Sequence, residues 1–368
     1  MRNFISGPAR WVVLAAAVVV ALIAPLYLTA FWLQLLFSIS AIAVGAIGLT
    51  LLTGTAGQLS LANPFFMVMG ALTYVVMSSP VDETGKLIGF GLPPIVGMIS
   101  GVAVAGITGL IFSPIASRLS GIYLGMASLG LVFLSLHILN NVTPVTGGYN
   151  GRRTPNFEIF GIVFGRSENP IVIGGVPFGR LEWLWYLGII CVVLGYIFAK
   201  NILRSRPGRA LRLIAAGDLP ASVAGVHVAG YKARIFFVSS LYAGLSGVLF
   251  ALSIGSIAPQ TFDLALALQF LAMIVIGGLG SVGGAVAGAA FVMSLPILLQ
   301  SALSNIPLFS GGALTTAYLS KYVYGAAIIL VLLFKPSGLA GMWDSLITRL
   351  ARRKNSSSNT AVPPHQRK

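Results

Sequence analysis

The side chains that could take part in chemistry are few in this chain and lie far apart. Its 368 residues include only three histidines, one cysteine and eight carboxylates. The histidines, His137, His227 and His365, lack the close spacing that a shared metal ion requires. No nucleophile stands with a base and an orienting group in a recognisable pattern. We therefore expect neither a metal centre nor an enzyme active site.

Two short segments approach nucleotide-binding motifs without completing them. Gly85-Lys86 is the only Gly-Lys pair, and it lacks both the upstream glycine and the following hydroxyl residue of a phosphate loop. Gly278, Gly280 and Gly283 have the spacing of a dinucleotide fingerprint, but no alternating strands and helices surround them. A turn or a broken helix between two apolar segments explains these glycines better.

All the carboxylates fall in predicted loops or at the ends of apolar segments. Carriers driven by a proton or sodium gradient usually hold a carboxylate inside a membrane span, because groups so costly to bury are kept for coupling. The sequence does not have that pattern, so any driving energy is expected to come from another chain. The residues are Asp82, Glu83, Glu158, Glu168, Glu182, Asp218, Asp263 and Asp344.

The composition places these residues in a membrane protein. Hydrophobic residues make up 57% of the chain and charged residues only 8%, whereas a soluble domain carries about 25% charged residues. This excludes a soluble enzyme, a disordered scaffold and a secreted disulfide scaffold. The single cysteine, Cys191, excludes an intramolecular disulfide, and 44 glycines indicate close helix packing.

Apolar runs near the ~20 residues that a bilayer requires predict an all-α polytopic protein with about ten transmembrane helices. The runs are continuous, whereas the strands of a membrane barrel alternate over about ten residues. The first run is too long for the core of a cleaved signal peptide, and a second follows at once, so we expect an uncleaved helix. The predicted spans are 11–31, 33–53, 59–78, 93–115, 121–140, 183–203, 235–257, 264–282, 283–303 and 317–334.

The distribution of basic residues predicts the topology. With the N-terminus inside and ten alternating spans, seventeen of the 23 Lys and Arg residues lie on the inner side. The positive-inside rule then predicts both termini in the cytoplasm. We attribute the net charge of +15 to this topology and to anionic lipid, not to nucleic acid. Residues 1–345 form the predicted membrane domain, and 346–368 a basic, disordered cytoplasmic tail.

Two polar segments interrupt the apolar runs. The outer one, about 141–182, is expected to be an ordered loop with a short hairpin at Ile171–Phe178, and it is either a solvated connector or a docking surface. The inner one, about 204–234, is expected to carry a small helix at Ala221–Gly225 with Asp218 as its N-cap and Pro220 near its first position. This inner segment is either bound by another protein or lies on anionic lipid headgroups.

The segment Gly54–Pro64 differs from the other glycine-containing runs. It places Gln58, Ser60 and Asn63 between apolar stretches, together with two glycines and a proline. Broken helices with free backbone groups provide polar sites near the membrane midplane in many transporters. A kinked but inert helix is the alternative, and we favour the polar site.

Several blocks of the sequence resemble the LivM-type permeases of ATP-binding-cassette importers for branched-chain amino acids, which are related to urea and amide permeases. Each block is weakly specific alone, but all of them follow the family order from about residue 35 to residue 341. The blocks are Gly48–Ser60, Gly121–Gly130, Asn140–Gly151, Arg204–Leu213, Ala221–Lys232, Tyr242–Pro259, Met273–Ala290 and Leu333–Gly341.

This resemblance implies a type II importer-like permease fold in a bacterial inner membrane. It implies a homologous second permease, two cytoplasmic ATPase subunits that bind ATP and Mg²⁺, and an extracytoplasmic solute-binding protein, with no cofactor on this chain. It also assigns roles to residues. The substrate pathway would include Gln58, Ser60, Asn63, Asn140, Asn141, Gly147, Gly148 and Asn150. The ATPase-coupling segment would include Arg209, Asp218, Pro220, Ala221, Ser222, Ala224 and Gly225.

The sequence departs from the family pattern at three places. Asn63 stands where relatives commonly carry histidine, Gln260 where they often carry an acid, and Pro220 where they usually carry alanine. If the first of these lines the pathway, the solute is not necessarily leucine, isoleucine or valine. A stand-alone secondary carrier, which would work without ATP or partners, and a membrane scaffold without transport are the alternative functions.

Overall fold

The structure is a computed structural model, and the long elements among the residues that it describes are all helices. It describes residues 21–80, 87–119, 121–159, 162–164, 172–173, 176–304 and a few positions between 325 and 341. Eight of the ten predicted spans are helical along most of their length. The other two, 11–31 and 317–334, lie largely outside the described residues. The long helices are α2 (Ala30–Leu49), α3 (Asn63–Ser78), α4 (Pro94–Arg118), α5 (Ile122–Asn141), α7 (Arg180–Arg204), α10 (Val228–Ile254), α11 (Leu264–Gly277) and α12 (Val282–Ser304).

Length and hydropathy show which of these helices can cross a membrane. Within the described residues, seven helical segments are long and apolar enough, and α3 is a shorter apolar helix. Two of them, α2 and α10, are mostly buried, because the other helices pack around them. By contrast, only a minority of the residues of α4, α5 and α7 are buried, and each of these helices exposes several large apolar side chains. Such faces suit lipid, so the chain is a multi-pass membrane protein.

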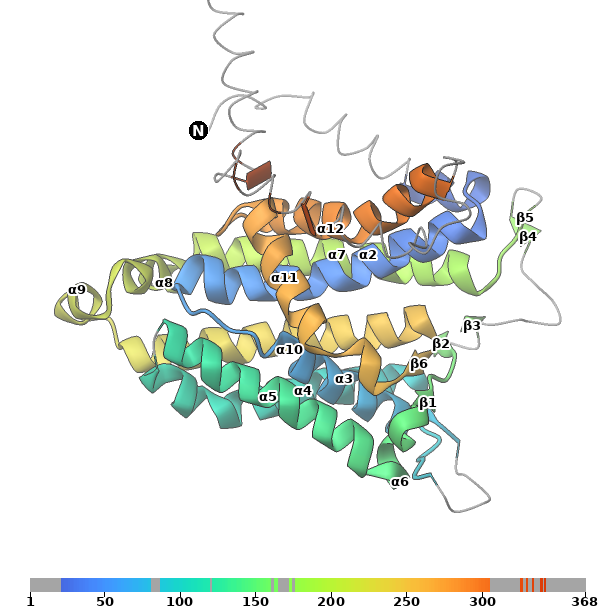
Figure 1. Ribbon diagram of the computed structural model, residues 1–368, viewed down its shortest axis with the longest axis horizontal. Helices are drawn as coiled ribbons and strands as arrows, with labels where there is room; N and C mark the ends of the chain where they lie inside the picture. The colour runs from blue at the N-terminus through green and yellow to red at the C-terminus, as the bar shows by residue number, and fades with distance from the viewer. Residues whose placement is uncertain are drawn as a thin grey trace, which may run out of the picture.

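The short elements gather at the two ends of the bundle (Figure 1). At one end, called here the α8–α9 end, lie α8 (Arg206–Ala216) and α9 (Asp218–Val223). The opposite end, called here the strand end, carries three two-stranded sheets and the short helix α6 (Thr143–Thr146). Its strands are β1 (Arg152–Arg153), β2 (Phe157–Ile159), β3 (Ile162–Phe164), β4 (Val172–Ile173), β5 (Val176–Pro177) and β6 (Ser256–Ile257).

The outer polar segment is ordered where the structure describes it. Strands β4 and β5 pair antiparallel, which confirms the hairpin predicted at Ile171–Phe178. Strand β1 pairs with β6, which ties this segment to the chain that follows α10. Arg152 is buried there, and its Nη1 donates to the carbonyl oxygen of Ile88 at 2.6 Å and to that of Val145 at 3.1 Å. The strand end is therefore held by hydrogen bonds between distant segments.

Glycine allows the helices of the core to touch through their backbones. A Cβ added at Gly70 of α3 would overlap the backbone of Gly244 in α10. The glycine-rich break predicted between the last two apolar runs is also a turn, with Gly278 at φ +106° and Gly280 at φ +79°. Only glycine adopts such values readily, and this confirms the turn between α11 and α12.

Candidate functional site

The broken segment predicted at Gly54–Pro64 is present, and it follows from the local sequence. Helix α2 continues as a π-helical turn, η1 (Thr50–Thr55), after which regular structure stops until α3 begins at Asn63. Gly57 has φ +69°, a left-handed conformation that disfavours other residues. Pro64 follows as the second residue of α3, where its missing N–H costs nothing. We call residues 56–62 the break.

Neighbouring helices hold the break through hydrogen bonds. The Gln58 side chain donates from Nε2 to the carbonyl oxygen of Ala116, in the last turn of α4, at 3.3 Å. The Leu61 N–H donates to the Ser128 hydroxyl of α5 at 2.8 Å. Ser60 accepts from the N–H of Ala62 at 3.3 Å, within the break itself. The break therefore has one defined conformation, supported by α4 and α5.

Unpaired polar atoms gather around this segment. In the described part of the chain, the buried atoms without a hydrogen-bond partner include Thr50 Oγ1, Gln58 Oε1, Asn63 Nδ2 and Ser246 Oγ. Ser246 lies on α10 and faces Gly45 of α2. Gly45 precedes Thr50 by a little over one helical turn. A buried polar group without a partner costs about 1–3 kcal/mol. Native proteins keep such groups mainly where ordered water or a polar ligand satisfies them.

The break lies toward the α8–α9 end of the bundle. Helix α2 with η1 covers Ala30–Thr55 and by itself is long enough to cross the ~30 Å hydrocarbon core. Gln58 then bonds to the last turn of α4, and a Cβ added at Gly57 would lie 3.4 Å from the Cα of Ala215 in α8. The break therefore follows a helix of full crossing length and lies beside the last turn of α4 and beside α8.

The second predicted group of pathway residues lies elsewhere. Asn140 and Asn141 are exposed at the far end of α5, and both donate to carbonyl oxygens of their own helix. Asn140 follows Ser128 by about 18 Å along the helix axis, so it is remote from the break. Gly147 and Gly148 have positive φ angles in the turn after α6, and Asn150 is exposed. The structure does not bring the two groups together.

The inner polar segment folds as two short helices with one difference from the prediction. Helix α9 begins at Asp218 after Gly217, three residues earlier than expected, so Asp218 is its first residue and not its N-cap. The Asp218 carboxylate instead accepts from Lys232 of α10, at 2.6 Å. Pro220 is the third residue, where the first turn still tolerates proline because its N–H needs no partner within the helix.

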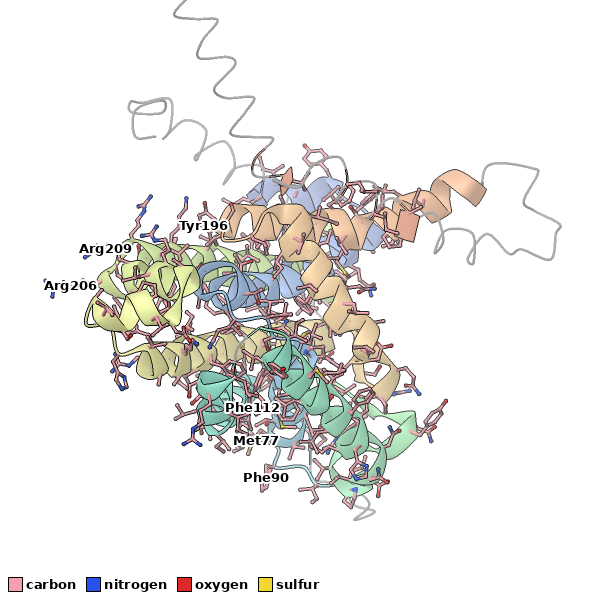
Figure 2. The ribbon with its side chains drawn as sticks, turned by 60° about the vertical axis from the view of Figure 1, so that its left-hand side comes forward. Met77, Phe90, Phe112, Tyr196, Arg206 and Arg209 are labelled. Carbon is pink, nitrogen blue, oxygen red and sulfur yellow. The ribbon has the colours of Figure 1, made fainter. Side chains whose placement is uncertain are left out.

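Helix α9 presents apolar side chains to its surroundings at the tip of the molecule. Leu219 is 80% exposed and Val223 is 88% exposed, and their spacing of four places both on one face of the helix. Of the predicted coupling residues only Ala221 is buried, while Arg209, Asp218, Pro220, Ser222, Ala224 and Gly225 are exposed. Figure 2 shows Arg206 and Arg209 projecting from α8 at the same end. Both residues lie in the inner polar segment that the sequence offered as a docking element, and the structure shows that they project outward.

The apolar helices define a multi-pass membrane protein with a buried polar break and an exposed helical tip. The chain belongs to the family of permease components of branched-chain amino acid transport systems, whose model matches residues 31–332. This confirms the resemblance, and it makes the chain a transporter component and not an enzyme.

Three relatives illustrate the similarity. The high-affinity branched-chain amino acid permease protein LivM of Salmonella typhimurium is 27% identical over 307 residues, covering 80% of this chain and 67% of the relative. A protein described as a probable LivM permease of Methanocaldococcus jannaschii is 26% identical and covers 82% of both chains. A probable ABC transporter permease of Sinorhizobium fredii is 28% identical over 262 residues, covering 71% of this chain and 68% of the relative. No solved structure matches the chain.

Proposed function

We propose that this permease is the membrane-spanning subunit of an ATP-binding-cassette importer for branched-chain amino acids or a related small polar solute. Its partners are a homologous second permease, two ATPase subunits that bind ATP and Mg²⁺, and an extracytoplasmic binding protein. The domain is the transmembrane region 1–345, with ten helices in a type II importer-like arrangement and a basic tail over 346–368. Both termini and the α8–α9 end face the cytoplasm, as the excess of basic residues there supports.

The observation that carries this proposal is the contact between the break and α8. Gly57 lies against Ala215, and only Gly217 separates α8 from α9. A protein that binds the exposed face of α9 is therefore only a few residues along the chain from Ala215. Ala215 contacts the break, which lies next to the unpaired groups of Gln58 and Asn63. ATP binding and release on that protein would shift the permease between a state open to one side of the membrane and a state open to the other. A partner shifts such an equilibrium because it binds the two states with different affinities.

The chemistry of the break suits a solute with no net charge. The unpaired groups in the break and beside it are the hydroxyl of Thr50, the amide oxygen of Gln58 and the amide nitrogen of Asn63, and none of them is ionised. Leu51 and Phe66 are buried on either side of this segment in the apolar core. A zwitterionic amino acid with an apolar side chain offers matching polar and apolar groups, and so does a small amide.

Reconstitution tests the proposal. The tagged chain is purified in gentle detergent from its native membranes, and the proteins that co-purify are identified by mass spectrometry. We expect ATPases with phosphate loops and a second permease, and we expect the reconstituted complex with its binding protein to take up radiolabelled leucine only when ATP is inside the vesicles. Uptake by this chain alone without ATP would contradict the importer and establish the secondary carrier.

A further inference from the structure

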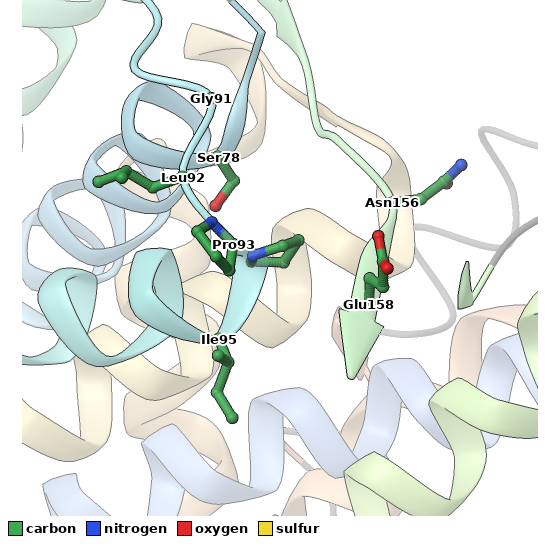
Figure 3. A pocket seen from close by; sticks show the side chains of 8 residues that line it. Ser78, Gly91, Leu92, Pro93, Ile95, Asn156 and Glu158 are labelled. Carbon is green, nitrogen blue, oxygen red and sulfur yellow. The ribbon is translucent and has the colours of Figure 1, made fainter. Parts of the chain in front are cut away.

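A cavity at the strand end has no role in the function proposed above. Its volume is about 550 Å³, and it lies between the end of α3, the beginning of α4 and strand β2 (Figure 3). The lining residues are Ser78, Gly91, Leu92, Pro93, Pro94, Ile95, Asn156 and Glu158. The cavity therefore joins an extramembrane strand to the start of a membrane helix.

The two walls of the cavity differ in polarity. Strand β2 supplies the polar wall, because the alternation of a strand buries Phe157 and turns Glu158 to the opposite side. The loop before α4 and its first turn supply the apolar wall. From there the exposed apolar face of α4 continues through Ile95 to Ile99, which is 63% exposed. The cavity is thus polar toward the extramembrane loop and apolar toward the lipid-facing helix.

A hydroxyl and a carboxylate that line the cavity are both available to bind a ligand. The Ser78 hydroxyl is buried and has no hydrogen-bond partner. The carboxylate of Glu158 makes no ion pair with any residue that the structure describes. In Figure 3, Ser78 lies on one side of Pro93 and Glu158 on the other. Tyr74 anchors the polar wall by donating to the carbonyl oxygen of Pro155 at 3.3 Å, so the cavity is preformed.

The position of the cavity argues against the transported solute as its ligand. Ser78 is about 22 Å from Asn63 along α3. Between them α3 packs backbone to backbone against its neighbours, since a Cβ at Gly70 would overlap Gly244 and a Cβ at Gly247 would overlap Met67. The contact between α3 and α10 is therefore closed between the cavity and the break.

We propose that the cavity binds the headgroup of a membrane lipid that carries a primary ammonium, such as phosphatidylethanolamine. The ammonium donates to the Glu158 carboxylate, a charge-assisted hydrogen bond. The Ser78 hydroxyl and the Asn156 amide donate to the phosphate and ester oxygens. The acyl chains follow the exposed face of α4 past Ile95 and Ile99. A choline headgroup has the same charge but no N–H, so it binds more weakly.

Native mass spectrometry tests this assignment on the full chain. The protein is equilibrated in micelles with equal amounts of ethanolamine, choline and glycerol phospholipids that have identical acyl chains. We expect the wild type to retain the ethanolamine lipid about tenfold over the choline lipid, a difference typical of one hydrogen bond to a charged group. Glu158→Gln should bring that ratio close to one, and Ser78→Ala should lower it less.

Glu182→Gln provides a matched control, because Glu182 is an acid at the same end that bonds the N–H of Gly179 in the first turn of α7. It should leave the lipid ratio unchanged. Equal retention of the ethanolamine and choline lipids by the wild type would overturn the proposal. So would a Glu158→Gln variant with normal lipid retention but weakened capture of the binding protein, because the cavity would then take a cationic side chain of that partner.

Discussion

The ammonium of Lys232 lies 2.6 Å from the carboxylate of Asp218, and the two side chains differ sharply in exposure, at 5% and 52%. The pair joins the first residue of α9 to the beginning of α10. A buried ammonium without a counter-charge is costly, so Lys232 holds Asp218 in place and thereby fixes the direction in which α9 projects. The exposed apolar face of α9 is therefore presented in one orientation.

Breaking this pair should lower both stability and coupling. Asp218→Asn is expected to destabilise the protein by about 1–2 kcal/mol, less than for a fully buried pair because the carboxylate is half exposed. Thermal unfolding in detergent measures the first effect, and ATP-driven leucine uptake measures the second. The double variant Asp218→Asn with Lys232→Met should recover the stability and not the uptake. Recovery of both would show that the pair does not orient α9.

The exposed tip of α9 is expected to bind the ATPase. Leu219→Asp together with Val223→Asp should abolish ATPase co-purification and ATP-driven uptake, because buried apolar contacts at the centre of an interface carry most of its affinity. Membrane insertion should remain normal, since both side chains project from the fold. Val142→Asp, at an exposed apolar residue of the strand end, is the control. Normal ATPase capture by the α9 variant would place the coupling surface elsewhere.

The left-handed turn at Gly57 should be needed for movement of the break. Gly57→Val is expected to lower uptake about tenfold while ATPase binding is kept, because a side chain at positive φ costs ~1–2 kcal/mol and this one would also press on Ala215. Gly130→Ala on α5 is the control. A Cβ at Gly130 meets no atom within 4 Å, so this control variant should be more stable than the wild type by roughly 0.5–1 kcal/mol. Equal uptake by both variants would contradict a role for the turn.

A substitution at Asn63 tests whether its buried amide serves transport or the structure of α3. Its Nδ2 is buried without a partner, so Asn63→Leu should leave the stability unchanged or raise it by about 1 kcal/mol. If the amide contacts the solute, the same variant should lose most leucine uptake, with unchanged assembly as judged by co-purification. Lower stability with normal uptake would instead make Asn63 a structural residue of α3.

Hydrophobicity along the chain was enough to predict the class of fold and most of the spans. Each membrane helix satisfies its own backbone hydrogen bonds, so its position depends on a local run of apolar residues. The break at Gly57 and Pro64, the turn at Gly278 and the β4–β5 hairpin also follow from residues that act within one turn. The order of sequence blocks predicted the family in the same way, and the family model confirms it.

Only the tertiary structure decided how these elements meet. The contact of Gly57 with Ala215 and the bond between Asp218 and Lys232 join residues that are not close neighbours in the chain, and no local pattern specifies them. From the sequence, Asp218 was therefore assigned as an N-cap, and Gln58 and Asn140 were assigned to one substrate pathway although the structure places them far apart. Those assignments depend on the packing of helices against one another, which is set by side chains far apart in the sequence.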